Sequence, residues 1–321
     1  MITTTQSLEI YEYDAVEPLA VLELNLLSLS YALTPQRVAL IRQLDARPFP
    51  FFALYAVEDS ILAGQVAVYR LPVMTLDGPQ EVGGASAVCT HPAFSGRGIA
   101  TALLEEAHRR MRLVGLRFST LGTSRFRLAH RLYHNIGYED VLPTQSIFLP
   151  VQEALIPTRL HAAPATPEGL HLADELYASV TPGRLGFSRR PRPFIPSIVA
   201  IGDLALEEVL LIWDGDELAG YAFARVSQAL LEVNHLLLVA GADPAEAVAS
   251  LAQAQPVSYL LLRLSHPPVL ESLRRLGYPP PRPDWGTFMV KPLEPGLTAA
   301  DFSRLCTVGT EQFMISPIDI T

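Results

Sequence analysis

The sequence of 321 residues contains only two cysteines, Cys89 and Cys306, and they form no CxxC pair. So few cysteines exclude a disulfide scaffold and disfavour a cysteine-based zinc site, and they suit a reducing compartment. Positive charge is scarce as well, because 24 Lys and Arg stand against 33 Asp and Glu, for a net charge of −9. A chain of this charge has no general electrostatic reason to bind nucleic acid or an acidic membrane.

Long apolar runs and leader-like segments are also missing. The first fifteen residues hold no basic stretch followed by an apolar one, so no signal peptide is predicted. The apolar stretch 15–33 is interrupted by acids too early to span a membrane. Because 49% of the residues are apolar and 18% are charged, we predict a globular, soluble, cytoplasmic protein long enough for two domains.

Apolar residues recur with a period of 2 or of 3.6 along the first 150 residues, which predicts alternating strands and helices. The predicted elements are helices over 17–33, from Thr34-Pro35 onward, 98–113 and 125–138, a hairpin over 51–70, and strands over 83–90, 117–124 and 144–151. The order hairpin, strand, helix, strand, helix, strand then recurs in the second half. Two copies of one fold are the simplest explanation.

The predicted fold class is therefore α/β (α+β), with two tandem domains that each hold a mixed, mostly antiparallel central sheet flanked by helices. The stretch 157–169 is rich in proline and alanine and is typical of a linker. The predicted division is a first domain over 1–152, a linker over 153–167, a second domain over 168–293 and a C-terminal tail over 294–321.

The stretch THPAFSGRGIATALLEEA (90–107) places two glycines between a strand and an amphipathic helix. The first turn of a helix has free N–H groups that favour an anion, and glycine lets the backbone approach it closely. A tight strand-to-helix connection would use the same residues, so the pattern alone leaves both interpretations open.

The neighbouring residues resemble the GCN5-related N-acetyltransferase (GNAT) superfamily. Its pyrophosphate loop, Gln/Arg-x-x-Gly-x-Gly/Ala, is similar to Ser95–Ala100, and its strand end V-x-x-x-P-x-(aromatic) is similar to VCTHPAF. Downstream, AHRLYHNIGYED resembles A-x-x-(F/L)-Y-x-x-x-G-(F/Y). The resemblance covers residues 5–150, and it reaches 168–293 only in the order of elements.

The resemblance implies acetyl-CoA as co-substrate, with no metal. The implied pantetheine contacts are the backbones of Val88, Cys89 and Thr90, and the implied pyrophosphate contacts are Ser95, Gly96, Arg97, Gly98, Ile99, Ala100 and Thr101. Thr123 and Ser124 would lie beside the cofactor, and Tyr133 would protonate the leaving thiolate.

Two residues depart from the family pattern. Ser95 replaces the usual Gln or Arg, although it can still cap the helix start, and Phe126 replaces an Asn found in many members. The general base is open. Glu81 is a candidate, although an exposed acid at a strand end is the favoured interpretation. A relayed water and the C-terminal carboxylate of Thr321 are the alternatives.

Two further patterns bear on binding. His130 and His134 have the i, i+4 spacing of metal ligands, but no third ligand is predicted nearby, so we expect solvated helix residues. In the second half, Asp243, Pro244 and Glu246 are typical of a capped helix start without a glycine pair. We therefore predict a degenerate second GNAT-like domain without cofactor.

The predicted function is transfer of acetyl from acetyl-CoA to a primary amine of a small molecule or peptide, by direct attack in a ternary complex. The partners would include no nucleic acid and no membrane, and the protein would be a monomer or homodimer. The alternative is a non-catalytic acyl-CoA-binding or protein-interaction module. A dinucleotide-binding oxidoreductase is disfavoured because GRGIAT lacks the third glycine of that motif.

Overall fold

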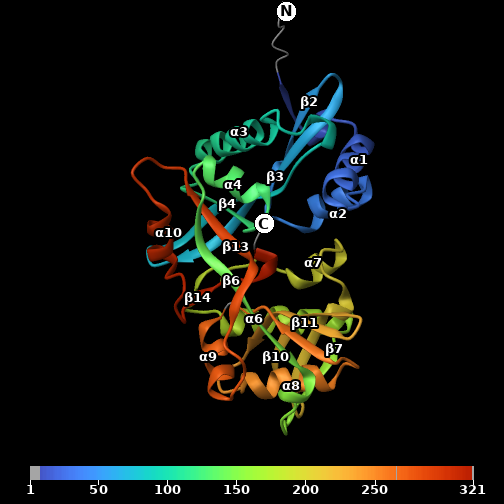
Figure 1. The fold of residues 1–321 in the computed structure, drawn as a ribbon, viewed down its shortest axis with the longest axis vertical. Coiled ribbons are helices and arrows are strands. Elements are labelled where there is room, and N and C mark those ends of the chain that lie inside the picture. The colour runs from blue at the N-terminus through green and yellow to red at the C-terminus, as the bar shows by residue number, and fades with distance from the viewer. Residues whose placement is uncertain (1–7, 265, 320–321) are drawn as a thin grey trace, which may run out of the picture.

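The computed structural model describes residues 8–264 and 266–319 and arranges them in two halves, one above the other in Figure 1. The elements of the first half are β1 (Glu9–Glu12), α1 (Pro18–Leu29), α2 (Pro35–Leu44), β2 (Pro48–Glu58), β3 (Ile61–Thr75), β4 (Gly78–Thr90), α3 (Ile99–Leu113), β5 (Phe118–Ser124), α4 (Leu128–Asn135) and β6 (Glu139–Pro150).

The second half begins with a short helix and ends with a helix and a short strand. Its elements are α5 (Val151–Ala154), β7 (Leu160–Pro164), α6 (Pro167–Val180), β8 (Leu185–Gly186), α7 (Ile195–Ala200), β9 (Val209–Asp214), β10 (Glu217–Ser227), β11 (Leu230–Leu238), α8 (Pro244–Gln253), β12 (Tyr259–Leu262), α9 (Pro267–Arg275), β13 (Arg282–Pro292), α10 (Ala299–Cys306) and β14 (Phe313–Met314).

The strands form one continuous mixed sheet in the order β1-β2-β3-β4-β5-β13-β6-β12-β11-β10-β9-β7. Most neighbouring pairs are antiparallel, and β4 with β5 and β11 with β12 are parallel. Helices pack on the sheet in both halves. The prediction of a mixed, mostly antiparallel sheet flanked by helices is therefore confirmed.

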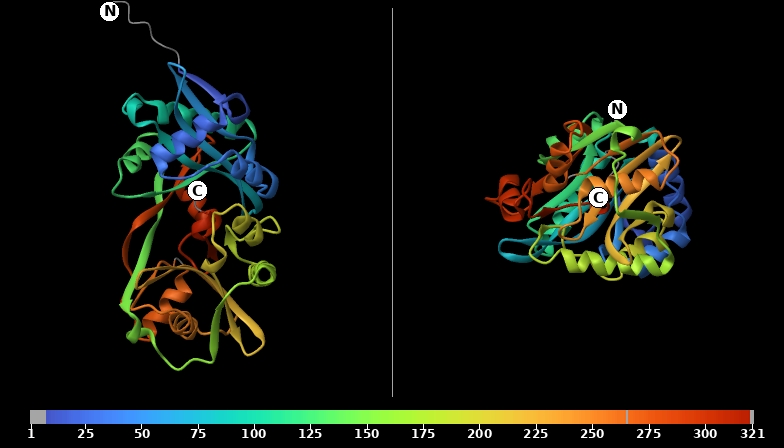
Figure 2. Two further views of the ribbon diagram at one scale, coloured as in Figure 1. Left: turned by 90° about the vertical axis from the view of Figure 1, so that its right-hand side faces the viewer. Right: turned by 90° about the horizontal axis from the view of Figure 1, so that it is seen from below.

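The two halves exchange strands. β13, from the second half of the sequence, lies between β5 and β6 and pairs antiparallel with both. The far end of β6, residues 147–150, pairs in turn with β12. In Figure 2 β6 and β13 run side by side from one half of the molecule to the other. The predicted boundaries at 152 and 168 stay a prediction, and the strand pairing crosses them.

Most predicted elements occur with shifted ends, and local chemistry explains where they begin and stop. Thr34 caps α2 by accepting a hydrogen bond from the Arg37 N–H, as its sequence signal indicates. The first helix ends at Leu29 instead of residue 33 because Ser30 adopts a left-handed conformation with φ of 54°. The tail contains α10, a helix that the sequence analysis missed.

Residues 160–164, inside the predicted linker, form β7, which pairs with β9. Because β7 is the last strand in the sheet order, proline is tolerated there on a free edge. In this stretch, the proline content is therefore explained by an edge strand and not by a linker.

One hydrophobic core cluster contains side chains from both halves. It joins Leu24 of α1 and Ile41 of α2 to Leu176 of α6 and Ile198 of α7, all of them buried. A second cluster lies under α3 and α4, and a third under α8 and α9. In the described part of the chain, no helix combines the length and the apolar run needed to cross a bilayer.

Candidate active site

The candidate site lies where β4 and β5 separate. These parallel strands pair only at Gly83 with Ser119 and Gly84 with Thr120. Beyond Gly84, the edge of β4 that faces away from β3 has no partner strand among the described residues. Its backbone N–H and C=O groups are therefore available to an extended ligand, in the way that a free strand edge accepts a peptide.

A β-bulge shapes this part of β4. The register with β3 shifts so that Ala87 and Val88 together face Val66, and Ala87 has a left-handed φ of 49°. Gln65 fixes the bulge by donating from its side-chain amide to the Ala87 carbonyl oxygen at 3.2 Å. The side chains of Gln65 and Asn25 form two hydrogen bonds with each other at 2.8 and 2.9 Å, and both residues are fully buried. Sequence reasoning missed this amide pair.

The start of α3 is open, as the glycine pattern predicts. Gly96 and Gly98 have φ of 78° and 80°, and a Cβ placed on either would meet no described atom within 4 Å. Gly98 is the N-cap of α3, and no side chain of the described residues caps that end. The first-turn N–H groups of the helix, from Ile99 onward, are consequently free to bind an anion.

Two side chains of the loop differ from expectation. Ser95 ends the preceding 3-10 turn, three residues before the N-cap, so the expected cap of α3 by Ser95 is wrong. Arg97 forms an ion pair with Glu58 at 2.7 Å, and its guanidinium lies 4.9 Å from the centre of the Phe94 ring. Its side chain is still half exposed, so it can turn toward a ligand.

Tyr133, on α4, is buried among the side chains under α3. Burial raises its pKa to about 12, and the nearby Cys89 thiol adds to the shift, so the phenol keeps its proton at neutral pH. The structure therefore brings Tyr133 close to Cys89 of β4. Thr123 and Ser124 end β5, where they pair with Thr287 and Gly286 of β13.

Other predicted residues lie elsewhere. Glu81 is near the start of β4, seven residues before Val88, which corresponds to about 23 Å along a strand. It forms an ion pair with Arg70, so the structure does not bring it to Tyr133 or to the bulge. Phe126 projects from the loop before α4 with 85% of its surface exposed. The Thr321 carboxylate lies outside the described residues.

A cavity of about 340 Å³ adjoins the bulge on the side of α1 and α2. Its lining is mostly aromatic and aliphatic, with Tyr31, Phe52, Tyr55 and Tyr69 among its members, and Ser86 and Ala87 contribute the β4 side. Among the described lining residues, Asp203 is the one with a carboxylate. It accepts hydrogen bonds from Arg37 at 2.8 Å and from the Tyr31 hydroxyl at 3.1 Å. No local pattern in the sequence indicates this arrangement, because Asp203 comes from the second half.

Comparison with known proteins identifies the family of this region. Residues 24–141, which include β4, the glycine loop, α3 and α4, match the family model of the acetyltransferase (GNAT) domain. This part of the chain is a GNAT domain. The comparison with curated proteins found no match to this sequence.

Solved structures share the fold over nearly the whole chain. A GCN5-related N-acetyltransferase from Anabaena variabilis has a TM-score of 0.66 at 14% identity and covers 90% of this chain and 73% of its own. A probable N-acyltransferase from Enterococcus faecalis has a TM-score of 0.68 at 14% identity, with coverage of 90% and 73%. Eis1 from Mycobacterium abscessus reaches 0.55 at 17% identity, with coverage of 90% and 74%. At these identities the similarity shows the fold.

The second half holds a region similar to the GNAT cofactor region, with a different helix start. β11 and β12 pair only from Leu230 with Tyr259 to Val233 with Leu262, as β4 and β5 do over a shorter length. Asp243 caps α8 by accepting from the N–H groups of Ala245 and Glu246 at 2.7 and 3.2 Å. The first-turn donors are thus occupied, in contrast to those of α3.

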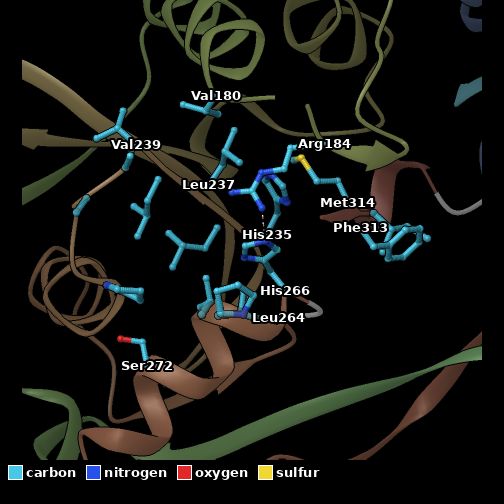
Figure 3. Close-up of a pocket in the computed structure, with 18 of the residues that line it drawn as sticks. Val180, Arg184, His235, Leu237, Val239, Leu264, His266, Ser272, Phe313 and Met314 are labelled. Carbon is cyan, nitrogen blue, oxygen red and sulfur yellow. Dashed lines mark hydrogen bonds between the residues drawn. The ribbon is translucent and has the colours of Figure 1, made fainter. Parts of the chain in front are cut away.

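A cavity of about 800 Å³ lies at the end of β11, between α8 and α9. Figure 3 shows leucine and valine side chains around it, with Arg184, His235 and His266 at one end. Arg184 Nη1 lies 3.4 Å from His266 Nε2, and Arg184 also donates to the Glu311 carbonyl oxygen. This cavity is lined by the second half and the tail, away from the GNAT loop.

Proposed function

We propose that this chain transfers the acetyl group of acetyl-CoA to a primary amine, and that its GNAT domain alone binds the acetyl donor. The observation that carries the proposal is the unpaired, bulged edge of β4 leading into the uncapped start of α3. A strand edge suits the amides of a pantetheine arm, and a glycine-lined helix start suits a pyrophosphate. The two features lie in the order in which acetyl-CoA carries these groups.

The donor would contact mainly backbone atoms. Val88, Cys89 and Thr90 offer the strand edge, and the N–H groups of residues 96–101 offer the anion site. Ser95 and Arg97 stand at the mouth of the loop, and Arg97 would exchange its ion pair with Glu58 for a phosphate. Thr123 and Ser124 complete the facing strand end. Acetyl-CoA supplies a thioester whose carbonyl carbon accepts a nucleophile.

The reaction places few demands on side chains. A neutral amine attacks the thioester carbonyl, a new C–N bond forms, and the C–S bond breaks. The departing thiolate takes a proton from Tyr133, which burial keeps protonated. Backbone N–H groups at the bulge would stabilise the negative oxygen, and the fixed positions of donor and amine account for much of the rate. Because Glu81 is remote, we assign the amine proton to a water.

The acceptor amine would occupy the cavity beside the bulge. This cavity reaches Ala87 from the side of α1, and its volume of about 340 Å³ suits a small molecule or a peptide N-terminus. Its aromatic wall favours an acceptor with an apolar or aromatic body, and the ion pair of Asp203 with Arg37 offers polar contacts to the amine. In this arrangement, the second half of the chain contributes Asp203 to the lining of the acceptor site.

Replacement of Tyr133 by Phe tests the chemistry. Release of the CoA thiol would be measured with a panel of primary amines, including aminoglycosides, polyamines, amino acids and short peptides. We expect Tyr133→Phe to lower kcat by about 10²- to 10⁴-fold because an acid catalyst is lost. The KM for acetyl-CoA should hardly change, since the hydroxyl contacts only the leaving thiolate.

Two outcomes would contradict this proposal. Equal kcat in Tyr133→Phe and wild type would remove Tyr133 from the chemistry. Binding of acetyl-CoA without turnover of any amine would instead favour a non-catalytic acyl-CoA-binding module, the alternative that the remote Glu81 and the exposed Phe126 motivate.

A further inference from the structure

The structure brings two histidines and one carboxylate together at the junction of α4 and β6. His130 and His134 lie on α4, and Asp140 lies near the start of β6. The ligand atoms of the three residues all lie within 4.8 Å of one another. The expectation that no third ligand lies near the histidine pair is therefore wrong.

Chain geometry explains the cluster. Residues four apart on a helix lie on the same face, so His130 and His134 point to one side of α4. Gly137 ends the helix with φ of 94° and turns the chain back, so that Asp140 returns beside that face. β6 then holds Asp140 in register, opposite Met289 of β13. Asp140 lies outside α4, beyond the chain reversal at Gly137. The i, i+4 spacing of the histidines therefore could not predict its position beside them.

The separations match those around a tetrahedral metal ion. Zinc held by nitrogen and oxygen ligands at about 2.0–2.1 Å keeps its ligand atoms about 3.3 Å apart. The Asp140 Oδ2 atom lies 3.1 Å from His130 Nε2 and 3.5 Å from His134 Nε2. The ligand atoms of the two histidines lie within 4.8 Å of each other, and the His134 side chain is 48% exposed, so its ring has room to turn toward an ion.

A carboxylate can accept hydrogen bonds from two imidazoles at once, and the same convergence presents three ligand atoms to one ion. Here both histidines direct Nε2 at the same carboxylate, and their rings are 5.0 Å apart between centres. The side chains of His130 and Asp140 are 18% and 29% exposed, so the cluster opens to solvent on one side. Three protein ligands with one open position form the coordination set of an accessible zinc site.

We propose that His130, His134 and Asp140 bind one Zn²⁺ ion, with water in the fourth position. Two imidazoles and one carboxylate suit borderline transition-metal ions, whereas Mg²⁺ requires more oxygen ligands. The bound ion would join α4 to β6 and so stabilise the segment that carries Tyr133. Tyr133 itself is buried on another face of α4 and is not a ligand.

Calorimetric titration of ZnCl₂ into the full, tag-free chain after treatment with EDTA tests this site. We expect one Zn²⁺ per chain, no binding of Mg²⁺, and a higher melting temperature with zinc, because a ligand that binds only the folded chain stabilises it. His134→Gln and Asp140→Asn should each weaken zinc binding by at least about 100-fold. Loss of a residue that only hydrogen-bonds to a metal ligand already weakens binding by up to about 100-fold, and loss of the ligand itself should weaken it more.

Two further variants make the result decisive. Asp140→His keeps three ligands and should retain zinc binding, which separates coordination from a folding defect. His161→Gln replaces an exposed histidine outside the cluster and should bind zinc as wild type does. Unchanged zinc affinity in His134→Gln and Asp140→Asn, or no zinc binding by wild type, would overturn the proposal. The titration needs no acyl donor, so its failure would leave the acetyltransferase proposal intact.

Discussion

At the scale of single residues, the site depends on groups that hold backbone in place. Gln65 and Asn25 are buried amides that satisfy each other and pin the Ala87 carbonyl at the bulge. Gln65 pairs with Cys89 across the β3–β4 ladder, and both amide side chains line the cavity proposed for the acceptor. They are positioning residues, because the bulge sets the direction in which the β4 edge presents its N–H groups.

A double-mutant cycle on this pair tests the coupling. Gln65→Met should cost about 1–3 kcal/mol of unfolding free energy, because the buried Asn25 Oδ1 loses its donor while Asn25 Nδ2 keeps only its hydrogen bond to the Val21 carbonyl oxygen. Asn25→Leu should cost a similar amount. The double variant should cost less than the sum of both, since no unpaired amide remains. Urea unfolding measures these values, and strictly additive costs would contradict the pairing.

The sequence contains clear local signals for some of these residues and none for others. The glycines of the loop and the motif around Tyr133 can be read from a dozen neighbouring residues. Asn25, Gln65 and Asp203 meet only through the tertiary fold, and each has an unremarkable neighbourhood in sequence. Asp140 completes its cluster for the same reason, through a reversal of the chain at Gly137.

At the scale of elements, the proposal of a single acetyl-CoA site rests on the difference between the helix starts of α3 and α8. Both helices follow a strand that separates from its parallel neighbour. Gly98 leaves the start of α3 open, whereas Asp243 occupies the first N–H groups of α8 and adds a negative charge. Helix starts are set by two or three residues, which is why the sequence predicts this difference correctly.

Element pairing was harder to predict than element position. The pattern of GTFMVKPL (286–293) predicts the final strand of the second copy, yet residues 286–292 form the end of β13, which pairs with β5 of the GNAT domain. Strand pattern encodes burial on each face but not the identity of the neighbouring strand. The same limit made the edge strand β7 look like a linker.

At the scale of the whole molecule, exchanged strands and a shared core join the halves into one cooperative unit. β6 and β13 each belong to the sheet of both halves, and one core cluster holds side chains of α1, α2, α6 and α7. Unfolding one half would therefore expose strand edges and apolar surface of the other. We expect a single unfolding transition.

This cooperative unit should lose stability in acid. Burial lowers the pKa of His108 to about 3 and lowers that of His235 well below its ordinary value, so both are neutral in the folded chain. Below pH 6.5 the unfolded chain binds protons that the folded chain does not. As the pH decreases below 6.5, the free energy of unfolding therefore decreases by up to about 1.4 kcal/mol per pH unit for each histidine.

Urea unfolding between pH 7.5 and 4.5 measures this dependence. His108→Gln can keep a hydrogen bond to the Tyr138 hydroxyl, now 2.8 Å from His108 Nε2, but cannot titrate. Its profile should be flatter than that of wild type below pH 6.5. Parallel profiles would contradict the role of His108, and two separate transitions would contradict the cooperative unit.

The most direct test of the central claim is calorimetric titration of acetyl-CoA into the full chain, with two matched glycine variants. Gly98 and Gly115 lie at opposite ends of α3, both with φ of 80° and open space at the Cβ position. Replacement by Glu strains the backbone equally at either position, but only Gly98→Glu places a carboxylate at the proposed phosphate site. We predict one acetyl-CoA per chain, abolished in Gly98→Glu and retained in Gly115→Glu. Two sites per chain, no binding by wild type, or equal loss in both variants would contradict the claim.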